Sequence, residues 1–277
     1  KGRGLFKRGI IQSGAYNLFD WTSKDESEKL GISAQTLLGA QNLQAMKNLT
    51  AETVLSASAT LGHPYGPNID GELIPNNLTR LLEEGSFNNI DLMIGSNKNE
   101  DYMYIDENVT ENDIDKHIER YYPEKKDTLL ALLNLEDPRL AMDHLTTNQV
   151  TLCPSAFIAR SLAKNGNNVY QYHFTRRREG SEKILSYHGA EIPYVFNTHD
   201  QWLPTNADDL QLTDAMMEYW AEFAKKGTPN SINNPTWKEF GTEENYLILN
   251  LPLENSSKLE NEFCEIMIDE LIKRSSN

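Results

Sequence analysis

The sequence has 277 residues, of which 39% are hydrophobic and 24% charged, an ordinary globular balance that can support a sizeable core. Its net charge of −15, without a basic patch, argues against nucleic acid or an anionic membrane surface as a partner. No apolar run reaches the roughly 18 residues that a membrane-spanning helix needs.

Apolar runs bounded by turn residues predict strands, and apolar residues three and four apart predict helices. In chain order we expect a strand at 8–14, helical segments in 24–60, an irregular Pro- and Gly-rich loop at 63–75, a helix before Gly85, a strand at 90–95, mostly helix over 110–165, a strand at 168–174, a helix at 211–226, a strand at 246–251 and a terminal amphipathic helix at 261–274. Strands that alternate with long helical stretches predict an α/β fold with a mainly parallel sheet.

Two candidate catalytic side chains follow predicted strands, which is where functional groups gather in such sheets. Glu100 lies in the loop after the 90–95 strand, and His188 lies in a turn beyond the 168–174 strand. A carboxylate that orients an imidazole base is the core of a hydrolytic triad. Asp101 and Glu191 are alternative carboxylate partners for His188.

The sequence does not contain the nucleophile that such a base would activate. It has no Gly-X-Ser-X-Gly motif and no His-Gly-Gly-Gly run for an oxyanion hole. Ser13 in IIQSG comes nearest, but Ile11 stands where the first glycine would be. The other histidines lack zinc-ligand spacing, and no motif indicates a metal or cofactor. On motifs alone, a structural role for His188 is the more common outcome.

The two cysteines, Cys153 and Cys264, leave two interpretations open. They are either two separate buried thiols or the two halves of a disulfide, and composition alone does not decide between them.

Six short segments carry a family resemblance: GLFKRGIIQSG, IDGELIP, IGSNKNED, YHGAEIPYVF, MMEYWAEFAKKGTPN and YLILNL. In this order, and at roughly this spacing, they resemble segments of the type-B carboxylesterases, the carboxylesterase/cholinesterase family. The similarity covers essentially the whole chain. It implies an α/β-hydrolase fold with a mainly parallel sheet flanked by helices, and it implies that residues 1–277 are the C-terminal part of one such domain.

The same resemblance assigns roles to individual residues. Glu100 matches the triad acid, His188 matches the triad histidine, and Glu191 matches a second glutamate that braces the histidine loop. Cys153 and Cys264 match a cholinesterase disulfide, which implies an oxidising compartment, secreted or periplasmic. No metal or cofactor is implied.

In the family, a segment like GLFKRGIIQSG follows shortly after the Gly-Glu-Ser-Ala-Gly nucleophile elbow. The sequence also begins without an initiator Met or a signal peptide. We therefore expect the serine and the oxyanion loop on an N-terminal segment that accompanies this chain, together forming a serine esterase that cleaves small carboxylic esters through an acyl-enzyme.

Two departures from the family pattern keep alternatives open. Asp101 stands where the family usually has glycine, and the TLGHPYG stretch lacks the paired phenylalanines of acetylcholinesterases. A choline ester hydrolase is therefore an alternative to a general carboxylesterase. A non-catalytic, cholinesterase-like binding or adhesion protein is the second alternative, although such proteins generally lose triad members.

Overall fold

The structure, a computed structural model, describes residues 2–15, 21–62 and 66–275. The chain divides into two units, one mainly of residues 17–80 and one of residues 2–16 with 81–277. That all of these residues belong to a single domain stays a prediction.

The smaller unit is helical, as the polar and helical character of residues 24–60 predicts. Its helices are α1 (Lys24–Leu37), α2 (Leu43–Lys47) and α3 (Ala51–Leu61), beside the short parallel pair β2 (Thr22–Ser23) and β3 (Asn68–Ile69). Ser23 begins α1 with a capping box to Glu26. Of the predicted loop at 63–75, residues 63–65 lie outside the described residues, and the remainder contains a turn in which Asp70 Oδ1 accepts three backbone N–H groups. The helix α4 (Leu78–Glu83) follows.

A five-stranded sheet forms the centre of the larger unit. Its spatial order is β1 (Arg8–Gln12), β4 (Asp91–Asn97), β5 (Val169–Phe174), β6 (Asn245–Leu249) and β7 (Glu254–Ser257). The first four strands pair in parallel, which confirms the predicted mainly parallel sheet. The antiparallel edge strand β7 was not predicted, because its sequence ENSS is polar and lacks the apolar pattern of a buried strand.

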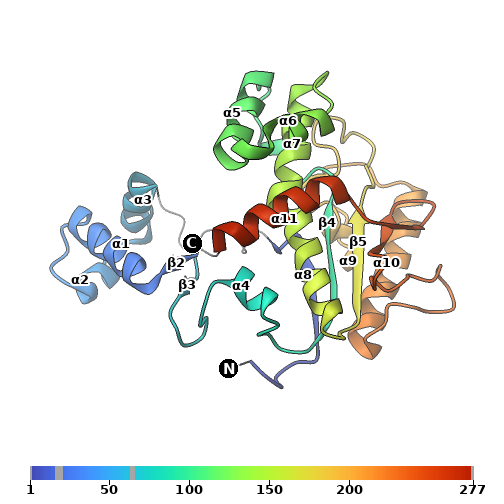
Figure 1. Ribbon diagram of the computed structural model, residues 1–277, viewed down its shortest axis with the longest axis horizontal. Helices are drawn as coiled ribbons and strands as arrows, with labels where there is room; N and C mark the ends of the chain where they lie inside the picture. Colours follow the sequence, from blue (N-terminus) through green and yellow to red (C-terminus); the bar gives the residue numbers. More distant parts are fainter. Residues whose placement is uncertain (1, 16–20, 63–65, 276–277) are drawn as a thin grey trace. The chain divides into compact units, whose positions relative to one another are not determined.

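Helices cover both faces of this sheet (Figure 1). On one face, α8 (Cys153–Lys164) packs on β4 and β5, and α11 (Asn261–Ser275) packs on α8. The core on this side contains Leu92, Ile94, Ala159, Leu162, Val169 and Phe240. On the other face, α9 (Ile192–Phe196) and α10 (Ala207–Lys226) enclose a core rich in aromatic rings, which includes Met93, Tyr172, Phe174, Tyr194, Tyr219, Trp220, Phe223 and Trp237. Successive residues of β4 thus supply both cores, as strand geometry requires.

The predicted helical region 110–165 contains several elements. They are α5 (Glu111–Tyr121), α6 (Lys126–Leu132), α7 (Pro138–Thr147), a π-helical turn (Asn148–Leu152) and α8, with short 3₁₀ turns at Tyr102–Tyr104 and Pro123–Lys125. A disulfide joins Cys153, at the start of α8, to Cys264 in α11. The disulfide interpretation of the two cysteines is therefore the one that the structure supports.

Two glycines of the larger unit are required by their surroundings. A Cβ atom on Gly95 in β4 would lie 2.4 Å from the ring and carbonyl of Tyr172 on the neighbouring strand. Gly227 ends α10 at φ +81°, where a Cβ atom would lie 2.5 Å from Asp91.

Helix α10 begins at Ala207, four residues before the predicted start, because Asn206 and Asp209 form a capping box.

None of the helices within the described residues is long and apolar enough to cross a membrane.

Candidate active site

Two loops at the carboxyl edge of the sheet bring His188 and Glu100 together. Glu100 follows the last residue of β4, Asn97, by three positions, and His188 lies in the connection between β5 and α9. His188 Nδ1 lies 2.7 Å from Glu100 Oε2. The Glu100 side chain is 2% exposed and the His188 side chain is 49% exposed, so a buried carboxylate orients a ring that solvent can reach.

The second oxygen of Glu100 has partners of its own. Glu100 Oε1 accepts a hydrogen bond from Ser13 Oγ at 2.6 Å and another from the Asn97 N–H at 2.6 Å. Ser13 directly follows β1 and has a φ of +52°. The carboxylate is thus fixed by donors from β1 and β4 as well as by the imidazole, and such charge-assisted bonds are the strong ones.

The protonation properties of His188 suit a general base. The hydrogen bond to Glu100 raises the pKa of His188 above its ordinary value, burial opposes this, and the charges of Glu100, Glu191 and Asp101 add to the rise. With Nδ1 donating to a carboxylate, the neutral ring presents Nε2 as an acceptor. A proton taken at Nε2 would produce an imidazolium that Glu100 stabilises.

Glu191 does not bind the imidazole. Its Oε2 accepts from Asn97 Nδ2 at 2.6 Å, and its Oε1 accepts from Gln12 Nε2 at 3.0 Å. Asn97 Nδ2 also donates to the backbone oxygen of Tyr187, the residue before His188, at 2.7 Å. Glu191 therefore links β1 and β4 to the histidine loop, while its role as a brace for that loop stays a prediction. Burial raises the pKa of this carboxyl.

Asp101, the other alternative partner, contributes its backbone to a different contact. The Asp101 N–H donates to Asp143 Oδ1 at 3.1 Å. Of the three carboxylates considered from the sequence, Glu100 is the one that the structure places on the His188 ring.

Sequence reasoning missed five polar contacts of this site, those made by Gln12, Asn97, Asp143, Thr147 and Ser13, the last of which it considered only as a nucleophile. Gln12 and Ser13 lie at the end of the predicted strand at 8–14, and Asn97 lies two residues beyond the predicted strand at 90–95, so a place at or just after a strand end was the signal that could have identified them. Asp143 and Thr147 lie on α7, and the sequence does not reveal that this helix packs behind the Glu100 loop.

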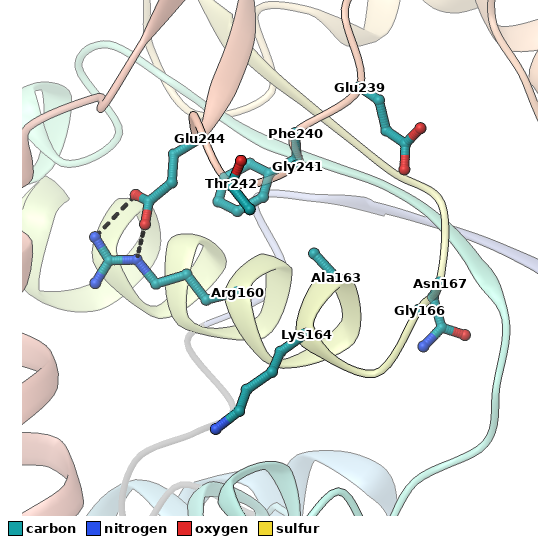
Figure 2. Close-up of a pocket in the computed structure, with 10 residues that line it drawn as sticks. All are labelled: Arg160, Ala163, Lys164, Gly166, Asn167, Glu239, Phe240, Gly241, Thr242 and Glu244. Carbon is teal, nitrogen blue, oxygen red and sulfur yellow. Dashed lines mark hydrogen bonds and ion pairs between the residues drawn. The ribbon is translucent and has the colours of Figure 1, made fainter.

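The cavity in Figure 2 lies at the opposite edge of the sheet, where β5 and β6 begin. Its volume is about 460 Å³. Arg160 and Lys164 are the cations that line the cavity. The guanidinium of Arg160 is paired with the carboxylate of Glu244, at N···O distances of 2.8 and 2.9 Å. Because ligands of parallel α/β sheets bind beyond the carboxyl ends of the strands, this cavity is not part of the candidate site.

Among the described residues, no group of three or more His, Cys, Asp and Glu side chains could bind a metal ion.

Comparisons with known proteins show which proteins this chain is similar to. A model of the carboxylesterase family matches residues 1–267. Neuroligin-3 of Mus musculus, Rattus norvegicus and Homo sapiens is 28% identical over 270 residues, which cover 82% of this chain and 32% of the relative. Liver carboxylesterase 1 of Mus musculus is 24% identical, covering 99% of this chain and 57% of the relative.

Solved structures show the same fold. The PNB esterase, 21% identical, superimposes with a TM-score of 0.79 over 95% of this chain and 58% of its own. A carboxylesterase of Geobacillus stearothermophilus, also 21% identical, has a TM-score of 0.80 over 95% of this chain and 59% of its own. These likenesses establish an α/β-hydrolase fold. The chain spans less than two thirds of the length of each of these relatives.

Proposed function

Because the chain belongs to the carboxylesterase family, we propose that it supplies the acid and the base of a serine esterase that cleaves carboxylic esters through an acyl-enzyme. Glu100 is the acid and His188 is the base. Glu191 is a supporting residue that braces the histidine loop.

The proposed reaction follows from which atoms of this pair can accept and return a proton. His188 Nε2 takes the proton of a serine hydroxyl while the serine oxygen attacks the ester carbonyl, and Glu100 stabilises the resulting imidazolium. The imidazolium then returns the proton to the leaving alcohol as the C–O bond breaks, which leaves an acyl-enzyme. Water, activated by the same imidazole, releases the carboxylic acid and restores the serine.

One observation carries this proposal: the 2.7 Å contact between His188 Nδ1 and the buried Glu100 Oε2, with the ring half exposed. Ser13 is not a suitable nucleophile, since its side chain is buried and donates to Glu100 rather than to the imidazole.

We place the nucleophilic serine and the oxyanion hole on a segment N-terminal to these 277 residues. Two facts support this placement. The 277 residues contain no Gly-X-Ser-X-Gly motif. The alignment with liver carboxylesterase 1 also includes 99% of this chain but only 57% of that relative. The partners of the chain are accordingly this segment and a small ester.

The Cys153–Cys264 disulfide supports a secreted or periplasmic location, because disulfides persist in oxidising compartments.

A non-catalytic binding protein on the same fold is the second candidate. The similarity to neuroligin-3, a relative whose name is not that of an esterase, favours it. The preserved acid–base pair argues for the esterase, since a binding surface does not require a buried carboxylate on an exposed imidazole.

The test uses the complete protein and a fluorophosphonate probe, which labels activated serines, together with hydrolysis of p-nitrophenyl butyrate. We expect labelling and turnover in the wild type and loss of both in His188→Gln. The matched control is His117→Gln, which alters a histidine whose ring bonds Gln149 and not Glu100. An unlabelled wild-type protein without turnover would establish the binding protein instead. Comparing butyrylcholine with p-nitrophenyl butyrate then separates a choline esterase from a general one.

A further inference from the structure

Asp143 on α7 is a fully buried carboxylate whose role the proposed chemistry does not explain. It is 0% exposed. Its Oδ2 accepts from Asn99 Nδ2 at 2.7 Å, and its Oδ1 accepts from the Asp101 N–H and from Thr147 Oγ1, both at 3.1 Å. All three partners are neutral donors. Carboxylates are almost never fully buried unless they are paired, so this one needs an explanation beyond packing.

These hydrogen bonds act on three consecutive residues of the loop that carries the proposed acid. Asn99 and Asp101, on either side of Glu100, bond to Asp143 directly. Thr147 Oγ1, which donates to Asp143, also accepts the Glu100 N–H at 3.1 Å. Asp143 is therefore the common acceptor that fixes the backbone and flanks of Glu100 from behind.

Asn99 extends the connection to the loop of the proposed base. Its Oδ1 accepts the Ser186 N–H at 3.4 Å, and its backbone N–H donates to the Ser186 oxygen at 3.2 Å. Ser186 precedes His188 by two residues. With its Nδ2 held by Asp143, the Asn99 amide must direct its oxygen toward Ser186, so one carboxylate orients the group that joins both loops.

We propose that Asp143 is a positioning residue of the triad, which keeps the Glu100 and His188 loops in register by accepting hydrogen bonds from Asn99, Asp101 and Thr147. The proposal rests on the proposed esterase function for its kinetic consequences. Its geometric consequence, the placement of Glu100 against the His188 ring, does not depend on that function.

A cavity of about 290 Å³ borders Asp143, Asn99 and Thr147. The other charged and titratable residues that line it are Lys98, His144, His173, Arg177 and Glu260.

Burial raises the pKa of Asp143 to about 6, while its bonds to Asn99, Thr147 and Asp101 oppose the rise and the charge of Asp101 adds to it. Protonation below that pH would turn one acceptor oxygen into a donor, which is the state that Asp143→Asn imitates.

The test is a double-mutant cycle at positions 99 and 143 in the complete protein. In Asp143→Asn, the new amide directs an N–H toward the N–H of Asn99, so the 99–143 bond is lost. In the pair Asn99→Asp with Asp143→Asn, donor and acceptor are exchanged, and the new carboxylate at 99 can still accept from Ser186. Restoration by the pair isolates this contact from general effects of each substitution.

The first readout is the pKa of the His188 ring, followed by NMR, because contact with Glu100 raises it. We expect it to fall toward the ordinary value of 6.5 in Asp143→Asn and to return in the exchanged pair. The second readout is hydrolysis of p-nitrophenyl butyrate. We expect kcat to fall by about tenfold to a hundredfold with KM changed by less than about threefold, and the pair to recover most of the loss.

A His188 pKa and a kcat that both stay at wild-type values in Asp143→Asn would overturn the proposal, as would an exchanged pair that recovers neither. If Asp143→Asn does not fold, Thr147→Val removes the hydroxyl between Asp143 and Glu100 and must shift the His188 pKa in the same direction. A wild-type protein without esterase activity, in which the His188 pKa still responds to Asp143→Asn, would refute the proposed function and leave the positioning role intact.

Discussion

The larger unit contains two histidine–glutamate pairs with nearly the same chemistry. His188 Nδ1 lies 2.7 Å from Glu100 Oε2, and His144 Nε2 lies 3.0 Å from Glu260 Oε2. In the first pair the carboxylate is buried and the ring half exposed, whereas in the second both side chains are about one third exposed, 37% for His144 and 34% for Glu260. The difference lies in what surrounds each carboxylate.

Glu100 is held on three sides, by Ser13, by Asn97 and by the imidazole, so its position does not depend on the ring. Burial would raise the pKa of Glu260, but the hydrogen bond and charge of His144 keep it below its ordinary value, so that pair depends on mutual attraction. The ring nitrogen that does not contact the carboxylate also differs, being Nε2 in His188 and Nδ1 in His144. In His188 this Nε2 lies on the far side of a half-exposed ring from Glu100. The His188–Glu100 pair therefore differs from the His144–Glu260 pair in having a carboxylate that is fixed independently of the ring, as the proposed catalytic role requires.

The largest effect that separates the two pairs is on turnover. Glu100→Gln removes the charge that stabilises the imidazolium, and we expect kcat for an ester to fall by about 10³- to 10⁴-fold. The matched change Glu260→Gln should leave kcat within about twofold of the wild type. Steady-state hydrolysis of p-nitrophenyl butyrate by the complete protein measures both. Equal losses in the two variants would show that the distinction between the pairs is wrong.

The next largest expected effect is on the free energy of unfolding, and it concerns the disulfide that lies close in sequence to Glu260. Glu260 directly precedes α11, and the Cys153–Cys264 bond closes a loop over a sequence separation of 111 residues. Replacing both cysteines by serine should lower the free energy of unfolding by about 2–5 kcal/mol. Urea denaturation measures this loss. Because the loops of Glu100 and His188 have their own contacts, kcat below the unfolding transition should change little. A large loss of kcat would contradict this independence.

Ser13→Ala tests whether Glu100 is fixed independently of the ring. The hydroxyl donates to a buried carboxylate, and such a bond contributes about 1.5–3 kcal/mol to stability. We expect an unfolding cost in that range and a loss of kcat of about tenfold from a less rigid acid. Ser155→Ala is the control, because Ser155 is equally buried in α8 and donates to the Thr151 backbone oxygen instead. If both serine variants kept full kcat, Ser13 would not contribute to positioning.

These contrasts also show what the sequence could and could not predict. Periodicity located β1, β4, β5, β6 and α10, since their apolar patterns are regular. Glu100 and His188 were identified as candidate acid and base through their places after strands and through the family resemblance, and these roles stay predictions. The sequence could not reveal which contacts β1 and α7 make with the Glu100 loop, because those contacts join residues 42 to 87 positions apart. Such long-range hydrogen bonds depend on tertiary packing, which local patterns do not encode.

The smallest effect is an opposite response of the two pairs to pH. The folded state raises the pKa of His188, so that pair contributes stability that is present at low pH and is lost as pH rises through the raised value. The folded state lowers the pKa of Glu260, so the second pair contributes stability above the ordinary value of 4.5 that is lost as pH falls through the lowered value. Because the Glu260 pair is partly exposed, Glu260→Gln should cost less than about 1 kcal/mol near neutral pH. Urea denaturation at several pH values measures this cost, which should disappear in acid. A cost that persists at low pH would mean that Glu260 stabilises the fold by packing and not by its charge.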